Sequence, residues 1–155
     1  MLLQRSLDVE LVINQLQFGL AHSGLIDAGL PSIMAGHIHL PAYTRRFNKD
    51  QTESEMLPAT LSKELITDLL KGQMGFNGVV VTDASHMVAL TAAMKRRDLL
   101  PTSIAAGCDL FLFFNDPDED FQWMLDGYNN GVITDDRLEE ALTRILGTKA
   151  ALGLH

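Results

Sequence analysis

The sequence predicts an α/β fold made of parallel β/α units. Three apolar runs of strand length, over 32–39, 78–83 and 110–114, alternate with stretches of helical periodicity. Apolar residues at consecutive positions are typical of parallel strands that are covered on both faces. More helices than strands are predicted, and a closed (β/α)8 barrel needs about 250 residues. An open doubly-wound sheet usually has about five or six strands. We therefore expect the 155-residue chain to form part of a larger parallel α/β fold.

The predicted helices begin at capping residues and end at glycines. Ser6, Ser62 and Thr134 are placed to begin helices, and Gly153 to end the last one. Pro101 suits the first turn of a helix, since its ring fixes φ and it has no N–H to leave unpaired. The expected helical spans are 6–22, 62–72, 87–97, 101–106, 118–128 and 135–152.

Packing against a core accounts for most apolar residues of the second half. The single cysteine, Cys108, lies in the apolar run 105–114, where a free thiol is most often a core residue. One cysteine also excludes an intramolecular disulfide and fits a reducing compartment. The other residues predicted to pack are Phe111, Phe113, Phe114, Trp123, Met124, Leu138, Ala141, Leu142, Ile145 and Leu146.

Composition and charge narrow the class of protein. The chain is 46% hydrophobic and has a net charge of −8, which argues against a nucleic-acid or anionic-membrane surface. Its one basic cluster, Lys95–Arg97, is expected to be a solvated helix end. No apolar stretch approaches the roughly 18 residues of a membrane span. We expect one cytoplasmic domain over residues 1–155.

Polar residues stand where the predicted strands end, and ligands of parallel α/β folds bind at that edge. Asp83 follows three valines, so its carboxylate should be engaged, either in chemistry or in capping the next helix. His37 and His39 should share one side of a strand, but no Cys or Glu completes a metal site. His86 lies near the same rim. No Rossmann or P-loop motif is present, and neither a metal nor a cofactor is expected.

Two segments of the sequence resemble glycoside hydrolase family 3. The first is Leu-Pro-Ala-Thr-Leu-Ser at 57–62, and the second is Gly-Phe-Asn-Gly-Val-Val-Val-Thr-Asp at 75–83, with Met87 following. In that family a Pro-Ala-Thr-Leu-Ser segment leads through a helix to a strand that ends in the nucleophilic aspartate. The resemblance extends to 34–37, 106–110 and 144–154, and so covers most of the chain.

The resemblance implies a retaining glycosidase with Asp83 as its catalytic nucleophile. A strand that ends in Met-x-x-His resembles the β-N-acetylhexosaminidase branch more than the β-glucosidase branch. Met34 and His37 are therefore expected to line the sugar subsite, with His86 at its rim. The substrate implied is a β-glycoside, most closely an N-acetylglucosaminide.

The acid/base group that the resemblance requires is missing. The hexosaminidase branch carries an Asp-His dyad in a Lys-His-Phe-Pro-Gly-His-Gly motif, and the β-glucosidase branch uses a glutamate on a following domain; this sequence has neither. The resemblance implies a partial TIM barrel, with this chain covering roughly strands six to eight of a (β/α)8 barrel and the N-terminal half absent. The chain alone is expected to have weak activity or none, unless His86 substitutes for the acid.

Two other classes of protein remain open. A noncatalytic half-barrel could self-associate through its uncovered strand edges. A small phosphate-binding or flavodoxin-like protein with three strands has little in the sequence to support it. The partners expected are thus a carbohydrate and either the missing barrel half or a second copy of the chain.

Overall fold

The computed structural model describes residues 24–47, 49–52 and 55–154 of the chain. The helix predicted over 6–22 lies outside these residues, as does His155. Residues 24–27 are helical, whereas the sequence predicted a break at Gly24. The turn that follows includes Gly29, whose φ of 83° suits glycine.

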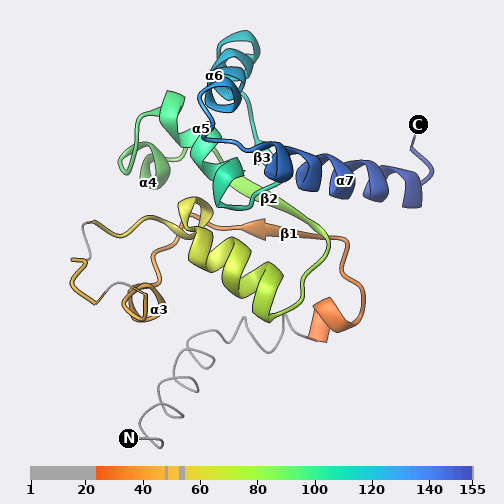
Figure 1. The fold of residues 1–155 in the computed structure, drawn as a ribbon, viewed down its shortest axis with the longest axis horizontal. Coiled ribbons are helices and arrows are strands. Elements are labelled where there is room, and N and C mark those ends of the chain that lie inside the picture. Colours follow the sequence, from red (N-terminus) through yellow and green to blue (C-terminus); the bar gives the residue numbers. More distant parts are fainter. Residues whose placement is uncertain (1–23, 48, 53–54, 155) are drawn as a thin grey trace, which may run out of the picture.

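Three parallel strands form the sheet, as predicted. They are β1 (Ser32–Ala35), β2 (Val79–Ala84) and β3 (Leu110–Leu112), and they lie in the order β1-β2-β3. In Figure 1 they run between the yellow-green helix of residues 64–73 and the blue C-terminal helix. Ser32 pairs with Val79 at the start of β2, and a bulge interrupts the β2–β3 register. β1 and β3 are shorter than the predicted strands.

The two faces of the sheet differ in what covers them. On one face Ile33, Ala35 and Val80 pack with Ile66, Phe76 and Cys108 in a buried cluster. The opposite face carries Met34, Val81 and Leu110, which are paired in register across the three strands. Met34 is 56% exposed and Leu110 42%. We call this second surface the open face, because parallel strands normally have both faces covered.

Helices account for most of the remaining described residues. Figure 1 shows α6 beyond α5 and α7 extending toward the C-terminus. No helix in the described part of the chain is both long and apolar enough for a bilayer span. The helices are α3 (Pro41–Thr44), the 3-10 turn η2 (Ala59–Leu61), the wide π-type helix η3 (Glu64–Gln73), α4 (Val88–Thr91), α5 (Arg96–Ala106), α6 (Pro117–Asn129) and α7 (Asp135–Ala151).

The ends of α7 agree with the prediction from the sequence, and the start of α5 does not. Thr134 accepts a hydrogen bond from the N–H of Arg137, and Gly153 ends the helix with a φ of 70°. The placement of Pro101 in a helical first turn was wrong, since α5 already begins at Arg96. Pro101 instead packs against α6, where a Cβ on Gly127 would overlap its ring.

Several residues predicted to pack are exposed. Phe113 and Phe114 are 56% and 59% exposed, because β3 ends at Leu112 and the chain turns outward there. Leu142 and Leu146 of α7 are also exposed. The helix is anchored by a different kind of contact, since its buried residues are Ala141 and the charged Arg137.

A buried carboxylate joins α7 to the sheet. Asp109, just before β3, has a fully buried side chain. One of its oxygens accepts the N–H of Val80 in β2 at 2.8 Å. The other accepts hydrogen bonds from Lys71 Nζ at 3.0 Å and from the Arg137 guanidinium. Because these donors come from three segments, one side chain connects β2, η3 and α7.

The same network continues over the start of α7. Arg137 also donates to the carbonyls of Ile104 and Cys108, both at 2.9 Å, where α5 ends. Glu140 pairs with Lys71 at 3.1 Å and with Arg137 at 2.8 Å. Burial raises the pKa of Glu140, but hydrogen bonds and charges from Lys71 and its neighbours outweigh this, and the pKa is lowered overall.

We predict that Asp109→Asn destabilises the chain by about 3–5 kcal/mol, because it leaves two buried cations facing a neutral amide. Urea unfolding followed by circular dichroism measures the change. The matched control is Asp126→Asn on the exposed surface of α6, which should stay within about 0.5 kcal/mol of the unsubstituted chain. Equal midpoints for the two variants would contradict the role given to Asp109.

Candidate active site

Asp83 lies near the carboxyl end of the central strand β2. Asp83 and Val81 are both half-buried, whereas Thr82 between them is fully buried, so Asp83 lies toward the open face with Val81. Its side chain is half-buried, and Oδ1 accepts a hydrogen bond from the N–H of Ala84 at 2.7 Å. The next helix, α4, has no side-chain cap. Helix capping therefore does not explain Asp83, and a carboxylate is left at the ligand-binding edge of the sheet.

His37 holds the end of β1 to the residue after Asp83. Its ring is buried, with Nδ1 2.6 Å from Thr60 Oγ1 and Nε2 3.0 Å from the carbonyl oxygen of Ala84. Because a carbonyl oxygen can only accept, Nε2 carries the proton and donates it. Both ring nitrogens of His37 thus have protein partners, and the contact fixes the backbone beside Asp83.

His37 and His39 do not share one environment, contrary to the expectation from strand alternation. β1 ends at Ala35, so the period of two does not continue through the histidines. His37 is buried and His39 is exposed. Among the residues that the structure describes, no three His, Cys, Asp or Glu side chains gather as a metal site would require.

Thr60 is a site residue whose role the sequence did not reveal. It lies in η2, is fully buried, and its hydroxyl also lies 3.2 Å from the carbonyl oxygen of Gly36. Its own carbonyl accepts a weak hydrogen bond from Cys108 Sγ at 3.7 Å. The Pro-Ala-Thr-Leu-Ser motif at 57–62 was the available signal, and Thr60 connects that motif to His37.

Met34 and His86 lie at the same edge of the sheet as Asp83. Met34 is on the open face, paired with Val81 two residues before Asp83. His86 is exposed in the turn between β2 and α4, and its ring centroid is 5.9 Å from that of Phe113. The structure thus brings His37 against the residue that follows Asp83, and leaves Met34 and His86 accessible nearby.

A buried ion pair joins the loops that follow β2 and β3. Arg96 donates to both oxygens of Asp120, at 2.8 and 2.6 Å, and through Nη1 to the carbonyl of Ser85 at 3.1 Å. Asp120 also accepts the N–H of Asn115 at 2.9 Å. We call Arg96, Asp120 and Ser85 the rim clamp.

Arg96 is therefore not the solvated helix end that was expected. It begins α5 instead of ending a helix, and its side chain is only 13% exposed. Burial raises the pKa of Asp120, but the Arg96 guanidinium and the N–H of Asn115 outweigh burial and hold this pKa below its usual value. The clamp is thus charged at neutral pH.

Cys108 is part of the core, as predicted. Its side chain is fully buried between the sheet and η3, and burial raises the pKa of the thiol to about 12. Since a thiol with this pKa stays protonated at neutral pH, Cys108 is not a nucleophile.

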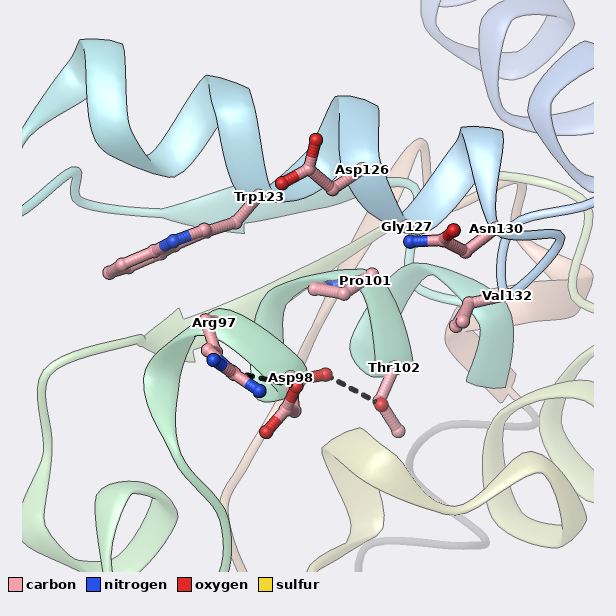
Figure 2. Close-up of a pocket in the computed structure, with 9 residues that line it drawn as sticks. All are labelled: Arg97, Asp98, Pro101, Thr102, Trp123, Asp126, Gly127, Asn130 and Val132. Atoms are coloured by element: carbon pink, nitrogen blue, oxygen red, sulfur yellow. Dashed lines mark hydrogen bonds and ion pairs between the residues drawn. The ribbon is translucent and has the colours of Figure 1, made fainter.

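A pocket of about 390 Å³ lies between α5 and α6, away from Asp83. Figure 2 shows the lining residues, with Trp123 and Asp126 on α6 and Pro101 and Thr102 on α5. Thr102 donates to the backbone carbonyl of Asp98 at 2.7 Å. Asp83, Met34, His37 and His86 are not among the lining residues. The candidate site is therefore the edge of the sheet and not this hollow.

Comparison of sequences places the chain among sugar-processing proteins. The family model for the glycosyl hydrolase family 3 N-terminal domain matches residues 13–148. A beta-N-acetylglucosaminidase/beta-glucosidase from Cellulomonas fimi is 47% identical over 138 residues, which is 89% of this chain and 24% of that protein. A beta-hexosaminidase from Chromobacterium violaceum is 35% identical over 95 residues. The chain thus spans about a quarter of the length of these curated relatives.

Solved structures agree with this comparison. The beta-glucoside phosphorylase BglX bound to 2FGlc matches 92% of the chain and 26% of its own length, with a TM-score of 0.85 and 40% identity. A glycoside hydrolase family 3 beta-N-acetylglucosaminidase from Paenibacillus sp. str. FPU-7 matches 86% of the chain and 25% of its own length. Its TM-score is 0.73 and its identity 27%.

We predict that the rim clamp makes stability depend on acid pH. Because the folded-state pKa of Asp120 is lowered, its contribution is present above the usual carboxyl pKa of about 3.9 and is lost as pH falls through the lower folded value. Asp120→Asn should cost about 3 kcal/mol near pH 7 and less near pH 3. Urea unfolding at both pH values measures this. A penalty for Asp120→Asn that does not shrink in acid would contradict the prediction.

Proposed function

The chain belongs to glycosyl hydrolase family 3, and from this we propose that it supplies the nucleophile of a retaining β-glycosidase, with Asp83 as that nucleophile. The observation that carries the proposal is the position of Asp83. It is a half-buried carboxylate at the carboxyl end of the central parallel strand, facing the open face and not used as a helix cap.

The proposed reaction is a double displacement. A carboxylate oxygen of Asp83 attacks the anomeric carbon, and the bond from that carbon to the leaving-group oxygen breaks while an acid protonates the oxygen. Water then attacks the anomeric carbon and gives its proton to the deprotonated acid, and the bond from that carbon to Asp83 breaks, which releases the carboxylate. The hydrogen bond from the N–H of Ala84 to Oδ1 orients the carboxylate. His37 holds the carbonyl of the same residue and so limits movement of this segment.

Met34 and His86 are proposed to border the sugar, and His37 to position the backbone next to it. Met34 offers an accessible apolar side chain on the open face, and His86 an accessible ring at the rim. His37 is proposed to act through the backbone beside Asp83, because both of its ring nitrogens have protein partners. The proposed substrate is an N-acetyl-β-glucosaminide or a β-glucoside, the two types named for the Cellulomonas fimi relative.

The open face is proposed to be completed by the rest of a (β/α)8 barrel, in which this chain forms strands six to eight. Met34, Val81 and Leu110 place apolar side chains on the same face of three parallel strands, and bulky apolar side chains fill the interior of closed barrels. The chain spans about a quarter of its relatives' length, and the remaining barrel would supply the acid/base group. A second copy of the chain is the alternative cover for this face.

Phosphate in place of water is a second candidate for the attacking group. The observation in its favour is the 40% identity and 0.85 TM-score to the beta-glucoside phosphorylase, against 27% and 0.73 for the beta-N-acetylglucosaminidase. Phosphate attack on the same glycosyl-enzyme would release a sugar phosphate. The first half of the reaction, and the role proposed for Asp83, would be unchanged.

We predict that the chain hydrolyses chromogenic N-acetyl-β-glucosaminide or β-glucoside only when mixed with an N-terminal barrel half, taken from the Cellulomonas fimi relative. In the mixture Asp83→Asn should lower kcat roughly 10³-fold or more, since the nucleophile is removed. The control Asp116→Asn lies at the same rim and should be neutral, because Asn can cap α6 as Asp116 does.

The other outcomes of this assay are distinct. Retained activity in Asp83→Asn would refute the nucleophile, and turnover by the chain alone would indicate that a nearby group such as His86 serves as the acid. Two results together would favour the self-associating module: no activity of the mixture, and a light-scattering mass of the chain alone above the monomer mass of 17.1 kDa.

For the second candidate, we predict that phosphate raises the rate of substrate cleavage by the mixture and changes the product from free sugar to a sugar 1-phosphate. Phosphorus NMR of the reaction identifies the product, and sulfate at equal ionic strength is the control. If free sugar is the sole product at millimolar phosphate, water is the attacking group and the second candidate is refuted.

A further inference from the structure

We propose that Phe113, together with His86, forms the aromatic wall of a sugar-binding subsite beside Asp83; this deepens the function proposed above and rests on it. Phe113 directly follows β3, at the carboxyl edge that also holds Asp83. Its ring centroid lies 5.9 Å from that of His86, at an interplanar angle of 38°. The two rings come from the loops after β2 and β3, on adjacent strands.

The backbone of Phe113 is held in a conformation that a bulky residue rarely adopts. Its φ is +62°, and it is the one non-glycine residue with positive φ in the described part of the chain. The left-handed region is unfavourable for a residue with a Cβ, and such strain persists only where the surroundings over-determine it. The chain has a phenylalanine at a position where glycine would fit without strain.

Hydrogen bonds from the rim clamp hold the backbone of Phe113 in this conformation. Ser85 Oγ donates to the carbonyl of Phe113 at 2.6 Å, and Arg96 Nη2 lies 3.5 Å from the same oxygen. The N–H of Ser85 donates to the carbonyl of Leu112 at 3.0 Å. Ser85 is two residues from Asp83, so the hydrogen bonds that hold Phe113 also fix its position relative to the proposed nucleophile.

The neighbouring Phe114 shows what a ring with a structural role looks like here. It is similarly exposed, at 59%, but its ring packs edge-on against Phe111 at 5.1 Å. Phe111 in turn packs against the buried cluster around Leu99 and Leu100. The ring of Phe113 contacts His86, which is itself exposed. Packing therefore explains Phe114 and leaves Phe113 as a large apolar surface at the rim.

The ligand class follows from the chemistry of this pair. A pyranose ring has one face of C–H groups, which pairs with a flat and rigid apolar surface such as the Phe113 ring. An imidazole beside it can donate or accept a hydrogen bond from a sugar hydroxyl. Apolar and aromatic walls with a few polar groups are the usual composition of small-molecule sites. A pyranose bound against Phe113 would lie next to Asp83.

The test uses Phe113→Gly, because glycine accepts the φ of +62° and keeps the carbonyl that Ser85 binds. In the active mixture, KM for the chromogenic glycoside should rise about five- to tenfold, with kcat changed less than about twofold. Phe113→Tyr, which keeps a ring, should restore KM, and the control Phe114→Leu should leave it unchanged. The thermal midpoint of Phe113→Gly should equal or exceed that of the unsubstituted chain.

A KM for Phe113→Gly equal to that of the unsubstituted mixture would overturn the proposal. A lowered thermal midpoint of Phe113→Gly would also overturn it, by showing that the ring has a structural role. Saturation-transfer NMR of methyl N-acetyl-β-glucosaminide and methyl β-glucoside with the chain separates this from the proposed function. Sugar contact that is lost in Phe113→Gly without any turnover by the mixture would support the wall and refute the glycosidase. Turnover by the mixture that is unchanged in Phe113→Gly would support the glycosidase and refute the wall.

Discussion

The fold depends on one buried carboxylate, that of Asp109. A charge removed from water is costly unless it is paired and hydrogen-bonded, and Asp109 meets this requirement with the N–H of Val80, Lys71 and Arg137. Those partners belong to β2, η3 and α7. The position of α7 follows from this pairing more than from its apolar face, since Leu142 and Leu146 remain exposed.

Two buried ion-pair systems lie at opposite ends of the sheet and have different consequences. The network around Asp109 precedes β3 and joins helices to strands. The rim clamp of Arg96 and Asp120 lies beyond the carboxyl ends of β2 and β3 and holds the loops around Asp83. In parallel α/β folds the carboxyl ends of the strands carry function, whereas the opposite end serves stability. The rim clamp lies at the functional end of the sheet, and the Asp109 network lies at the end that serves stability.

The open face links the fold to the proposed chemistry. Asp83 and the layer of Met34, Val81 and Leu110 share that face, so whatever covers it also encloses the carboxylate. Glycosidases need a second group that donates a proton, and exclusion of water strengthens electrostatic interactions within the site. A cover that closes the sheet and supplies the acid would meet both needs together.

Local patterns in the sequence predicted the strands and several of the helix ends of this chain, but not the division of 87–106 into α4 and α5. The three parallel strands, the cap at Thr134, the stop at Gly153, the buried Cys108 and the position of Asp83 at a strand end all follow from nearest-neighbour chemistry. These features depend on the periodicity of apolar residues and on the dihedral preferences of a few residues, which the order of amino acids contains directly.

Only the tertiary structure decided the partners of the polar groups. Nothing near Arg96 in the sequence indicates that Asp120 will neutralise it, and nothing near His37 indicates Thr60 and Ala84. These pairs are separated by more than twenty residues and meet because helices, turns and loops pack against one another around the sheet. The backbone of Phe113 and the interior position of Pro101 have the same origin, since packing between elements overrode the local preference of each residue.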